Sequence, residues 1–217
     1  MKQQPFISVI MSVYNTDFSF VKRAIDSVLN QDFQDFEFII IDDGSEEIYK
    51  KELEEYSILH KNKIIYRYHV NCGQSKSINK GVLISSGKYI AIIDADDEYK
   101  ADHLSACLKE IQKADLIAST THTIVDKEED YYVPDKKDPS KLIHVDDCIL
   151  FATMFGKKEV FEKLKFEDRY AADALFFETA SEYFKVQKVN LRTYIYYRNI
   201  PNSVSAKLKN LHSLKLV

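Results

Sequence analysis

The chain has 217 residues, a formal net charge of −4 and a pI of about 5.9, and 45% of its residues are hydrophobic. This length and apolar content suit one globular domain with a full-sized core, which we place at residues 1–217. The acidic balance argues against a protein that binds the phosphate backbone of nucleic acid. The three cysteines are widely spaced without a C-x-x-C pair, which indicates a reduced compartment rather than a disulfide framework or a zinc site.

The apolar run at the amino terminus is too short for a signal peptide, and no segment approaches the ~20 apolar residues of a membrane-spanning helix. We therefore expect a cytoplasmic protein. The tail 206–217 combines leucines with three lysines and has no acidic residue. A terminal helix packed on the domain is the favoured interpretation of this tail, and peripheral contact with the inner face of an anionic membrane is the alternative.

Apolar, β-rich runs alternate with amphipathic segments four times within the first hundred residues. The pattern predicts strands at 6–13, 36–41, 64–68 and 89–93, and helices at 20–29, 46–60 and about 74–84. These spacings fit right-handed β-α-β crossovers, so the sequence predicts an α/β fold with a mostly parallel central sheet and helices on both faces.

The second half of the chain has a less regular pattern. It predicts helices at 102–113, 159–164 and 173–183, and strands at 115–125 and 193–198. The stretch 126–141 has ten charged residues among sixteen, with two prolines. Solvated surface is the favoured interpretation of this stretch, and a loop over the functional cleft is the alternative.

Three of the predicted strands end in polar clusters, at 14–15, 42–43 and 94–97. Because the carboxyl ends of parallel strands lie along one edge of a sheet, these clusters should converge on one cleft. The last cluster, D-A-D-D, places three carboxylates within four residues. Such carboxylates repel one another, and a hard divalent cation commonly offsets the repulsion. An acidic turn that caps the next helix is the alternative interpretation.

Five motifs follow one another in a fixed order. They are S-V-I-x-x-V-Y-N at 8–15, V-L-N-Q-x-F at 28–33, I-D-D-G-S at 41–45, N-x-G-x-S-x-x-x-N-x-G at 71–81 and G-x-Y-I-x-x-x-D-x-D-D at 87–97. Together they resemble the inverting glycosyltransferases of the GT-A fold, specifically family 2. The resemblance covers residues 7–205. It implies a Rossmann-like half at 1–100 that binds a nucleoside-diphosphate sugar, and a half at 101–205 that supplies the acceptor site and the catalytic base.

The resemblance also implies roles for individual residues of the nucleotide pocket. Val13, Tyr14 and Asn15 would border the pocket. Asp42 would hydrogen-bond the base, since a carboxylate accepts from the N–H of uracil, thymine or guanine. Its neighbour Asp43 is expected to cap the turn that follows.

The diphosphate side of the donor site would consist of Asp94, Ala95 and Asp96. Asp94 would lie near the ribose, and Asp96, together with Asp94, would hold the Mn²⁺ or Mg²⁺ that bridges the two phosphates. Asp97 would support them from behind. Arg198 is expected to reach the diphosphate, with a surface ion pair as its alternative role.

An inverting transfer needs a base on the acceptor hydroxyl, usually a carboxylate on the far side of the sugar. The family's E-D pair aligns with Ala172 and Asp173, so Asp173 is the predicted base, and a helix N-cap is its alternative role. Glu178 is a second candidate. Ala172 and Ile200 stand where the family carries Glu and His.

The resemblance therefore implies an enzyme that moves a sugar from a nucleoside-diphosphate sugar, UDP-sugar by default, to a glycan or lipid-linked glycan. Surface polysaccharide is the implied product. Nucleotidyl transfer on the same fold is disfavoured, because no Gly-rich basic loop follows the first strand. A degenerate sugar-nucleotide-binding protein remains the alternative, because Ala172 and Ile200 depart from the family pattern.

Overall fold

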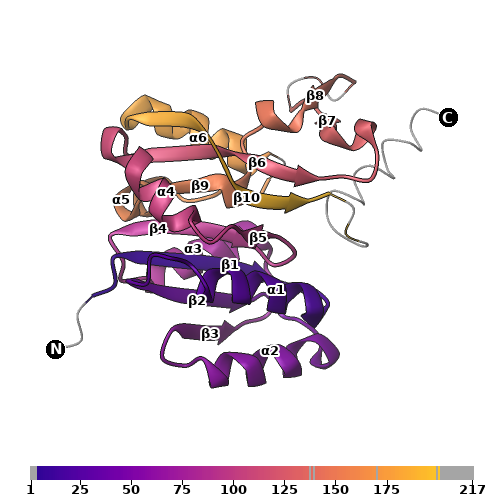
Figure 1. Ribbon diagram of the computed structural model, residues 1–217, viewed down its shortest axis with the longest axis vertical. Helices are drawn as coiled ribbons and strands as arrows, with labels where there is room; N and C mark the ends of the chain where they lie inside the picture. Colours follow the sequence, from indigo (N-terminus) through magenta and orange to yellow (C-terminus); the bar gives the residue numbers. More distant parts are fainter. Residues whose placement is uncertain (1–3, 137, 139, 170, 199, 201–217) are drawn as a thin grey trace.

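An eight-stranded sheet runs through the computed structural model, which describes residues 4–136, 138, 140–169, 171–198 and 200 (Figure 1). The strand order is β3-β2-β1-β4-β9-β6-β10-β5. Six of these strands run in one direction, and β9 and β5 run against them, so the predicted mostly parallel sheet is confirmed. The bounds are β1 Ile7–Val13, β2 Phe36–Asp42, β3 Ile64–Tyr68, β4 Tyr89–Asp94, β5 Glu98–Tyr99, β6 Leu116–Ile124, β9 Met154–Lys157 and β10 Val186–Tyr197.

Helices cover both faces of this sheet, as predicted. Successive side chains of a strand point to opposite faces, so Val9 and Met11 of β1 join one core cluster while Ile10 joins the other. The first cluster includes residues of α1, α2 and α4, and the second includes residues of α3, α5 and α6. The helix bounds are α1 Phe18–Leu29, α2 Glu47–Leu59, α3 Gln74–Ile84, α4 His103–Glu110, α5 Lys158–Leu164 and α6 Ala172–Tyr183.

Local sequence explains why α1 forms where it does. The carboxylate of Asp17 accepts a hydrogen bond from the backbone N–H of Ser19 at 2.8 Å, which caps the first turn. The side chains that α1 buries against the sheet recur at helical spacing: Val21, Ala24, Ile25 and Val28. The loop between β1 and α1 begins where β1 ends, so it lies at the carboxyl edge of the sheet.

Two strands of the second half differ from the sequence prediction. Strand β9 was not predicted, although it pairs antiparallel with both β4 and β6 and joins the two halves of the sheet. Its Gly156 permits this close packing, because a Cβ there would lie 2.8 Å from Leu116 Cδ1. Strand β10 begins at Val186, earlier than predicted. The prediction missed this start because the first part of the strand contains mainly exposed polar side chains.

The charged stretch 126–141 is not simple solvated surface, so the favoured interpretation of it is wrong. It begins with a 3₁₀ turn at Glu128–Tyr131 and continues into a hairpin of β7, Tyr132–Pro134, with β8, Leu142–His144. Figure 1 shows this hairpin beyond the carboxyl ends of β6 and β10. The charged residues lie in a segment that lines the functional cavity, which is the alternative we considered.

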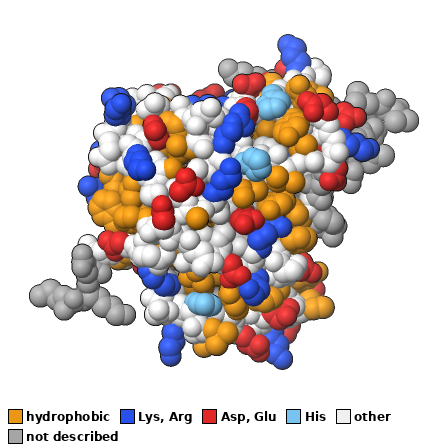
Figure 2. All heavy atoms as spheres, viewed as in Figure 1, with side chains coloured by type: hydrophobic (Ala, Val, Ile, Leu, Met, Phe, Trp, Pro, Cys, Tyr) orange, Lys and Arg blue, Asp and Glu red, His pale blue; other side chains and the backbone are white. Residues whose placement is uncertain are grey.

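Basic and acidic side chains are interspersed on the face of the molecule shown in Figure 2. The helices of the described residues are all too short or too polar to cross a membrane. The predicted tail helix at 206–217 lies outside the described residues.

Candidate active site

A cavity of about 1460 Å³ opens at the carboxyl ends of β1, β2 and β4. Residues from all three polar clusters line it, so the predicted convergence on one cleft is confirmed. The first turn of α6 and the β7–β8 hairpin form the opposite wall. The volume exceeds the roughly 300–1,000 Å³ of a pocket for one drug-sized ligand, which leaves room for two substrates.

The loop after β1 places Tyr14 and Asn15 on the cavity wall. Asn15 has a φ of 45°, and its backbone N–H donates to Ser45 Oγ at 3.0 Å. The backbone N–H of Glu46 returns a bond to Asn15 Oδ1 at 2.8 Å, so the loops after β1 and β2 are tied together. Val13 does not line the cavity, contrary to expectation, because its side chain packs in the core with 3% exposure.

The two aspartates that follow β2 lie in places opposite to those we expected. Asp42 is fully buried, and its carboxylate accepts from Tyr66 Oη at 2.7 Å and from the backbone N–H of Ser45 at 2.8 Å. Asp42 therefore caps the turn and does not reach the cavity. Asp43 lines the cavity instead, where its carboxylate accepts from the backbone N–H groups of Cys72 and Gly73.

The turn after β4 places Asp94, Ala95 and Asp96 on the cavity wall, as predicted. Burial, followed by the charges of Asp96 and Asp173, raises the pKa of Asp94 to about 7. Burial also raises the pKa of Asp96. Gln74 donates to Asp94 Oδ1 at 2.8 Å, and Arg23 donates to the backbone carbonyl of Asp96 at 2.5 Å. These two positioning contacts were not predicted, because they join segments far apart in the sequence.

Asp97 supports this turn from behind. It is 1% exposed and accepts from Tyr194 Oη at 2.7 Å and from the backbone N–H of Tyr197 at 2.9 Å. The same Tyr194 hydroxyl accepts from the backbone N–H of Asp94 at 3.2 Å. Burial and the charges of Asp96 and Asp94 hold the pKa of Asp97 well above its usual range. Tyr194, a buried residue of β10, thereby attaches this strand to the turn that contains Asp94, Asp96 and Asp97.

Asp173 lies on the opposite wall, in the first turn of α6. The helix is preceded by Ala171 at the N-cap position, with a φ of 52°, so Asp173 does not occupy the N-cap. Burial raises the pKa of Asp173, although backbone N–H groups that include that of Ala174 lower it in part. Its charge acts on Asp94, which indicates that the two carboxylates face one volume.

The other carboxylates near this wall are engaged in ion pairs. Glu178 pairs with Lys136 of the hairpin segment, and Asp168 pairs with Lys76 at 3.0 Å. Both acidic side chains are more than half exposed, so their surroundings resemble those of ordinary surface carboxylates. By contrast, Asp173 is partly buried and has a raised pKa.

Arg198 lines the cavity, and its side chain is largely buried rather than at the surface. It is 8% exposed, and its Nε donates to the backbone carbonyl of Asp130 at 3.0 Å. Arg198 also donates to Tyr196 Oη at 3.2 Å. Ile200 contributes an apolar side chain to the same cavity. Arg198 thus anchors the segment that leads to the β7–β8 hairpin.

Comparison with known proteins establishes the family. The model of glycosyl transferase family 2 matches residues 8–181, and the chain belongs to this family. It is 29% identical to an uncharacterized glycosyltransferase of Rickettsia prowazekii, over 99% of this chain and 72% of that protein. It is 36% identical to a putative colanic acid biosynthesis glycosyl transferase, WcaA, of Escherichia coli, over 52% of this chain and 40% of that one. The chain thus spans well under half of WcaA.

Solved structures show the same fold. S. aureus TarS in complex with UDP-GlcNAc superposes with a TM-score of 0.70 at 17% identity, covering 97% of this chain and 66% of that one. The mannosyltransferase PcManGT of Pyrobaculum calidifontis, in complex with GDP-Man and Mn²⁺, superposes with a TM-score of 0.72 at 15% identity, covering 99% and 63%. These neighbours confirm the predicted GT-A fold.

The oxygen atoms of Asp94 and Asp96, in the turn after β4, suit a hard divalent cation as ligands. Asp94 and Asp96 offer only oxygen ligands, which Mg²⁺ and Mn²⁺ prefer. Burial and mutual repulsion disfavour their ionised forms, and a bound cation would offset both effects. The residues present therefore fit such a cation.

Proposed function

We propose that this chain transfers one sugar, with inversion, from a nucleoside-diphosphate sugar to a glycan or lipid-linked acceptor. The observation that carries the proposal is one cavity with Asp43, Asp94 and Asp96 on one wall and Asp173 on the other. Such an arrangement supplies a base pocket, a diphosphate site and a proton acceptor on opposite sides of a bound sugar. UDP-sugar is the default donor, and assembly of surface polysaccharide is the proposed setting.

In this mechanism the chain's own residues position two substrates and accept one proton. Asp43 accepts from the N–H of the base, and Tyr14 and Asn15 border the nucleotide. Asp173 takes the proton of the acceptor hydroxyl while the hydroxyl oxygen attacks the anomeric carbon from the face opposite the diphosphate. The anomeric C–O bond breaks, and its electrons leave with the nucleoside diphosphate. Asp94 and Asp96 would hold a Mn²⁺ or Mg²⁺, which would supply charge neutralisation at that leaving group.

The raised pKa of Asp173 supports its assignment as the base. A carboxylate with an elevated pKa is a stronger proton acceptor, provided that it is ionised at the working pH. A degenerate binding protein remains the second candidate function. The observation that favours it is the pair of apolar residues, Ala172 and Ile200, where the family carries Glu and His.

Thermal unfolding with UDP, GDP, dTDP and CMP, each with Mn²⁺, Mg²⁺ or EDTA, tests donor binding. A nucleotide at about a hundred times its dissociation constant should stabilise the fold by roughly 2.7 kcal/mol. We expect a metal-dependent shift with one nucleotide, and we expect Asp96→Asn to lose it. The absence of any shift would contradict the proposed donor site.

Incubation of the protein with the matching nucleotide sugar and metal then separates the two candidate functions. A transferase should release nucleoside diphosphate and give a product whose anomeric configuration, read by NMR, is opposite to that of the donor. A binding protein would show the thermal shift without turnover. Retention of configuration would contradict the inverting mechanism.

A further inference from the structure

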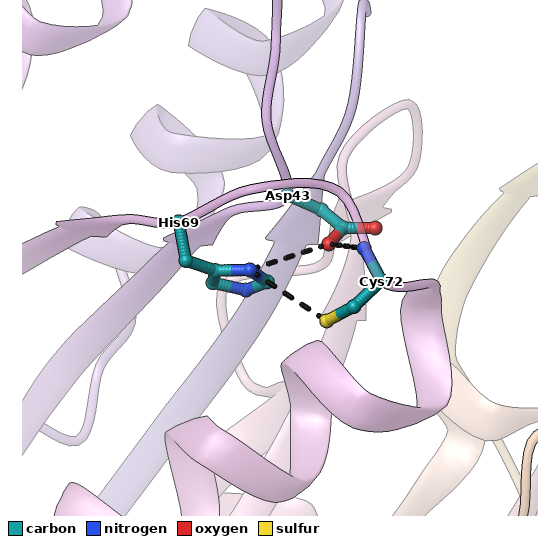
Figure 3. A group of neighbouring side chains, drawn as sticks. All are labelled: Asp43, His69 and Cys72. Atoms are coloured by element: carbon teal, nitrogen blue, oxygen red, sulfur yellow. Dashed lines mark hydrogen bonds and ion pairs between the residues drawn. The ribbon is translucent and has the colours of Figure 1, made fainter.

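Three side chains of metal-binding type lie together beside the donor cavity (Figure 3). They are Asp43 after β2, His69 after β3 and Cys72 in the turn that leads into α3. One ligand atom of each lies within 4.8 Å of the other two. The wide spacing of the cysteines disfavoured a zinc site, but this cluster takes its carboxylate from another loop.

The distances in the cluster match those of a zinc site. His69 Nδ1 lies 3.6 Å from Asp43 Oδ1 and 3.6 Å from Cys72 Sγ. Ligand bonds of about 2.0–2.3 Å in a tetrahedral site place neighbouring ligand atoms about 3.3–3.6 Å apart. Two of the three separations therefore match what one zinc ion requires, and the third, between Asp43 and Cys72, is at most 4.8 Å.

Neighbouring groups hold two of these ligands in place. The Asp43 carboxylate, 2% exposed, accepts from the backbone N–H groups of Cys72 and Gly73 at 2.8 and 2.9 Å. Gly73 has a φ of 97°, a left-handed conformation that glycine adopts readily, at the point where this turn leads into α3. His69 Nε2 lies 3.1 Å from Ser77 Oγ, which orients the ring as outer partners of metal ligands do.

We propose that Asp43, His69 and Cys72 bind Zn²⁺ through Oδ1, Nδ1 and Sγ, with the fourth position taken by water or a ligand. Imidazole and thiolate select zinc over Mg²⁺ and Mn²⁺, so this site differs in chemistry from the oxygen-only pair of Asp94 and Asp96. His69 Nδ1 lies 2.7 Å from the carbonyl of Val70 in the metal-free protein. Zinc binding displaces that contact and releases the proton of the thiol and that of Nδ1 where present.

The site is linked to the donor pocket through Asp43. A carboxylate oxygen that binds zinc is no longer available to accept from the base of a nucleotide. Zinc and the nucleotide therefore compete, and zinc inhibits the protein. This consequence, unlike the zinc site itself, rests on the proposed function of Asp43.

Cobalt spectroscopy tests the site without any enzyme assay. Titration of the metal-free protein with Co²⁺ should give a thiolate-to-cobalt charge-transfer band that added Zn²⁺ abolishes. Cys72→Ser should lose the band, and His69→Gln should weaken Co²⁺ binding at least ~10-fold. Cys148→Ser, at a cysteine that lines the cavity, should keep the band. Absence of the band in the wild type, or its persistence in Cys72→Ser, would overturn the site.

Nucleotide titrations with and without Zn²⁺, at saturating Mg²⁺, test the link to the donor pocket. We expect Zn²⁺ to weaken nucleotide binding to the wild type at least ~10-fold and to affect Cys72→Ser much less. Equal weakening in both proteins would place the inhibitory zinc at Asp94 and Asp96 and overturn the competition. A cobalt band in a protein that binds no nucleotide would leave the zinc site standing while the proposed function fails.

Discussion

The two walls of the cavity are built in different ways. On the donor wall, Asp43, Asp94 and Asp96 follow directly from paired strands, and buried partners such as Tyr194 hold their turns. On the opposite wall, Asp173 stands in the first turn of a helix, and the β7–β8 hairpin contacts that helix through the Lys136–Glu178 ion pair. Paired strands fix the position of the donor wall, whereas loops and a surface ion pair fix the position of the opposite wall. The first wall suits a donor with a constant diphosphate, and the second suits acceptors that vary.

Asp173→Asn should have the largest effect and should separate the two walls. It removes the proton acceptor, so we expect transfer to slow by about 10²–10⁴-fold while the dissociation constant for nucleotide stays unchanged. Initial rates and a nucleotide titration on the same preparation measure both quantities. Glu178→Gln is the matched control and should retain turnover. Full turnover in both variants would show that neither carboxylate is the base.

The neighbouring aspartates of the donor wall should respond differently to the same substitution. Asp43→Asn places an amide donor against the base, so we expect the dissociation constant for nucleotide to rise about 10–100-fold. Asp42→Asn should instead destabilise the fold by ~1–3 kcal/mol, because Asp42 accepts from Tyr66 and Ser45 in the interior. Calorimetric titration and urea unfolding measure the two effects. Loss of nucleotide binding in a fully folded Asp42→Asn protein would restore our original assignment.

Tyr194→Phe should show how firmly the donor wall is attached to β10. It leaves the Asp97 carboxyl and the backbone N–H of Asp94 each without one partner, so we expect a loss of ~1–3 kcal/mol in unfolding free energy. Tyr99→Phe is the matched control, because Tyr99 is similarly buried and its hydroxyl donates to the carbonyl of Ile92. Tyr99→Phe should lose ~0.5–1.5 kcal/mol in unfolding free energy. Urea unfolding that gave equal losses would contradict a special role for Tyr194.

A further expected effect concerns pH in EDTA. With its pKa raised to about 7, folded Asp94 keeps a proton between about pH 4 and pH 7 that the unfolded chain has released. The folded state therefore binds more protons in this window, and the unfolding free energy falls as the pH rises. Asp94→Asn removes this contribution, so its unfolding free energy relative to the wild type should rise between pH 4 and pH 8 by up to ~4 kcal/mol, since each pKa unit is worth about 1.4 kcal/mol.

Asp115→Asn should give the opposite trend, because the hydrogen bond from Lys157 holds the pKa of Asp115 below its usual value. Its stabilising contribution is present above the ordinary Asp pKa and is lost as the pH falls through the lowered one. Unfolding followed at pH 2, pH 4 and pH 8 compares the two variants, because the Asp115 contribution is lost only below about pH 4. Parallel pH profiles for Asp94→Asn and the wild type would show that Asp94 does not titrate in this window.

The first half of the fold was predictable because its signals are local. Strands β1, β2 and β4 bury both faces, and apolar runs of that kind followed by acidic turns are visible in the sequence. The second half of the fold was less predictable from the sequence. Strand β9 is four residues long and acquires its strand conformation from β4 and β6 on either side. The first part of β10 is polar, so only its parallel pairing with β6 identifies it.

The sequence by itself determined which turns carry the carboxylates and that the ends of the parallel strands bring them together. Only the tertiary structure decided which carboxylate faces the cavity. Consecutive residues at a strand end point in opposite directions, so the sequence alone does not show whether Asp42 or Asp43 faces the cavity. The folded structure shows it, because Tyr66 on β3 donates a hydrogen bond to Asp42 in the interior. The same holds for the cluster of Asp43, His69 and Cys72, whose members come from two separate loops. Local pattern sets where a side chain lies along the chain, and the packing of distant segments sets what it meets.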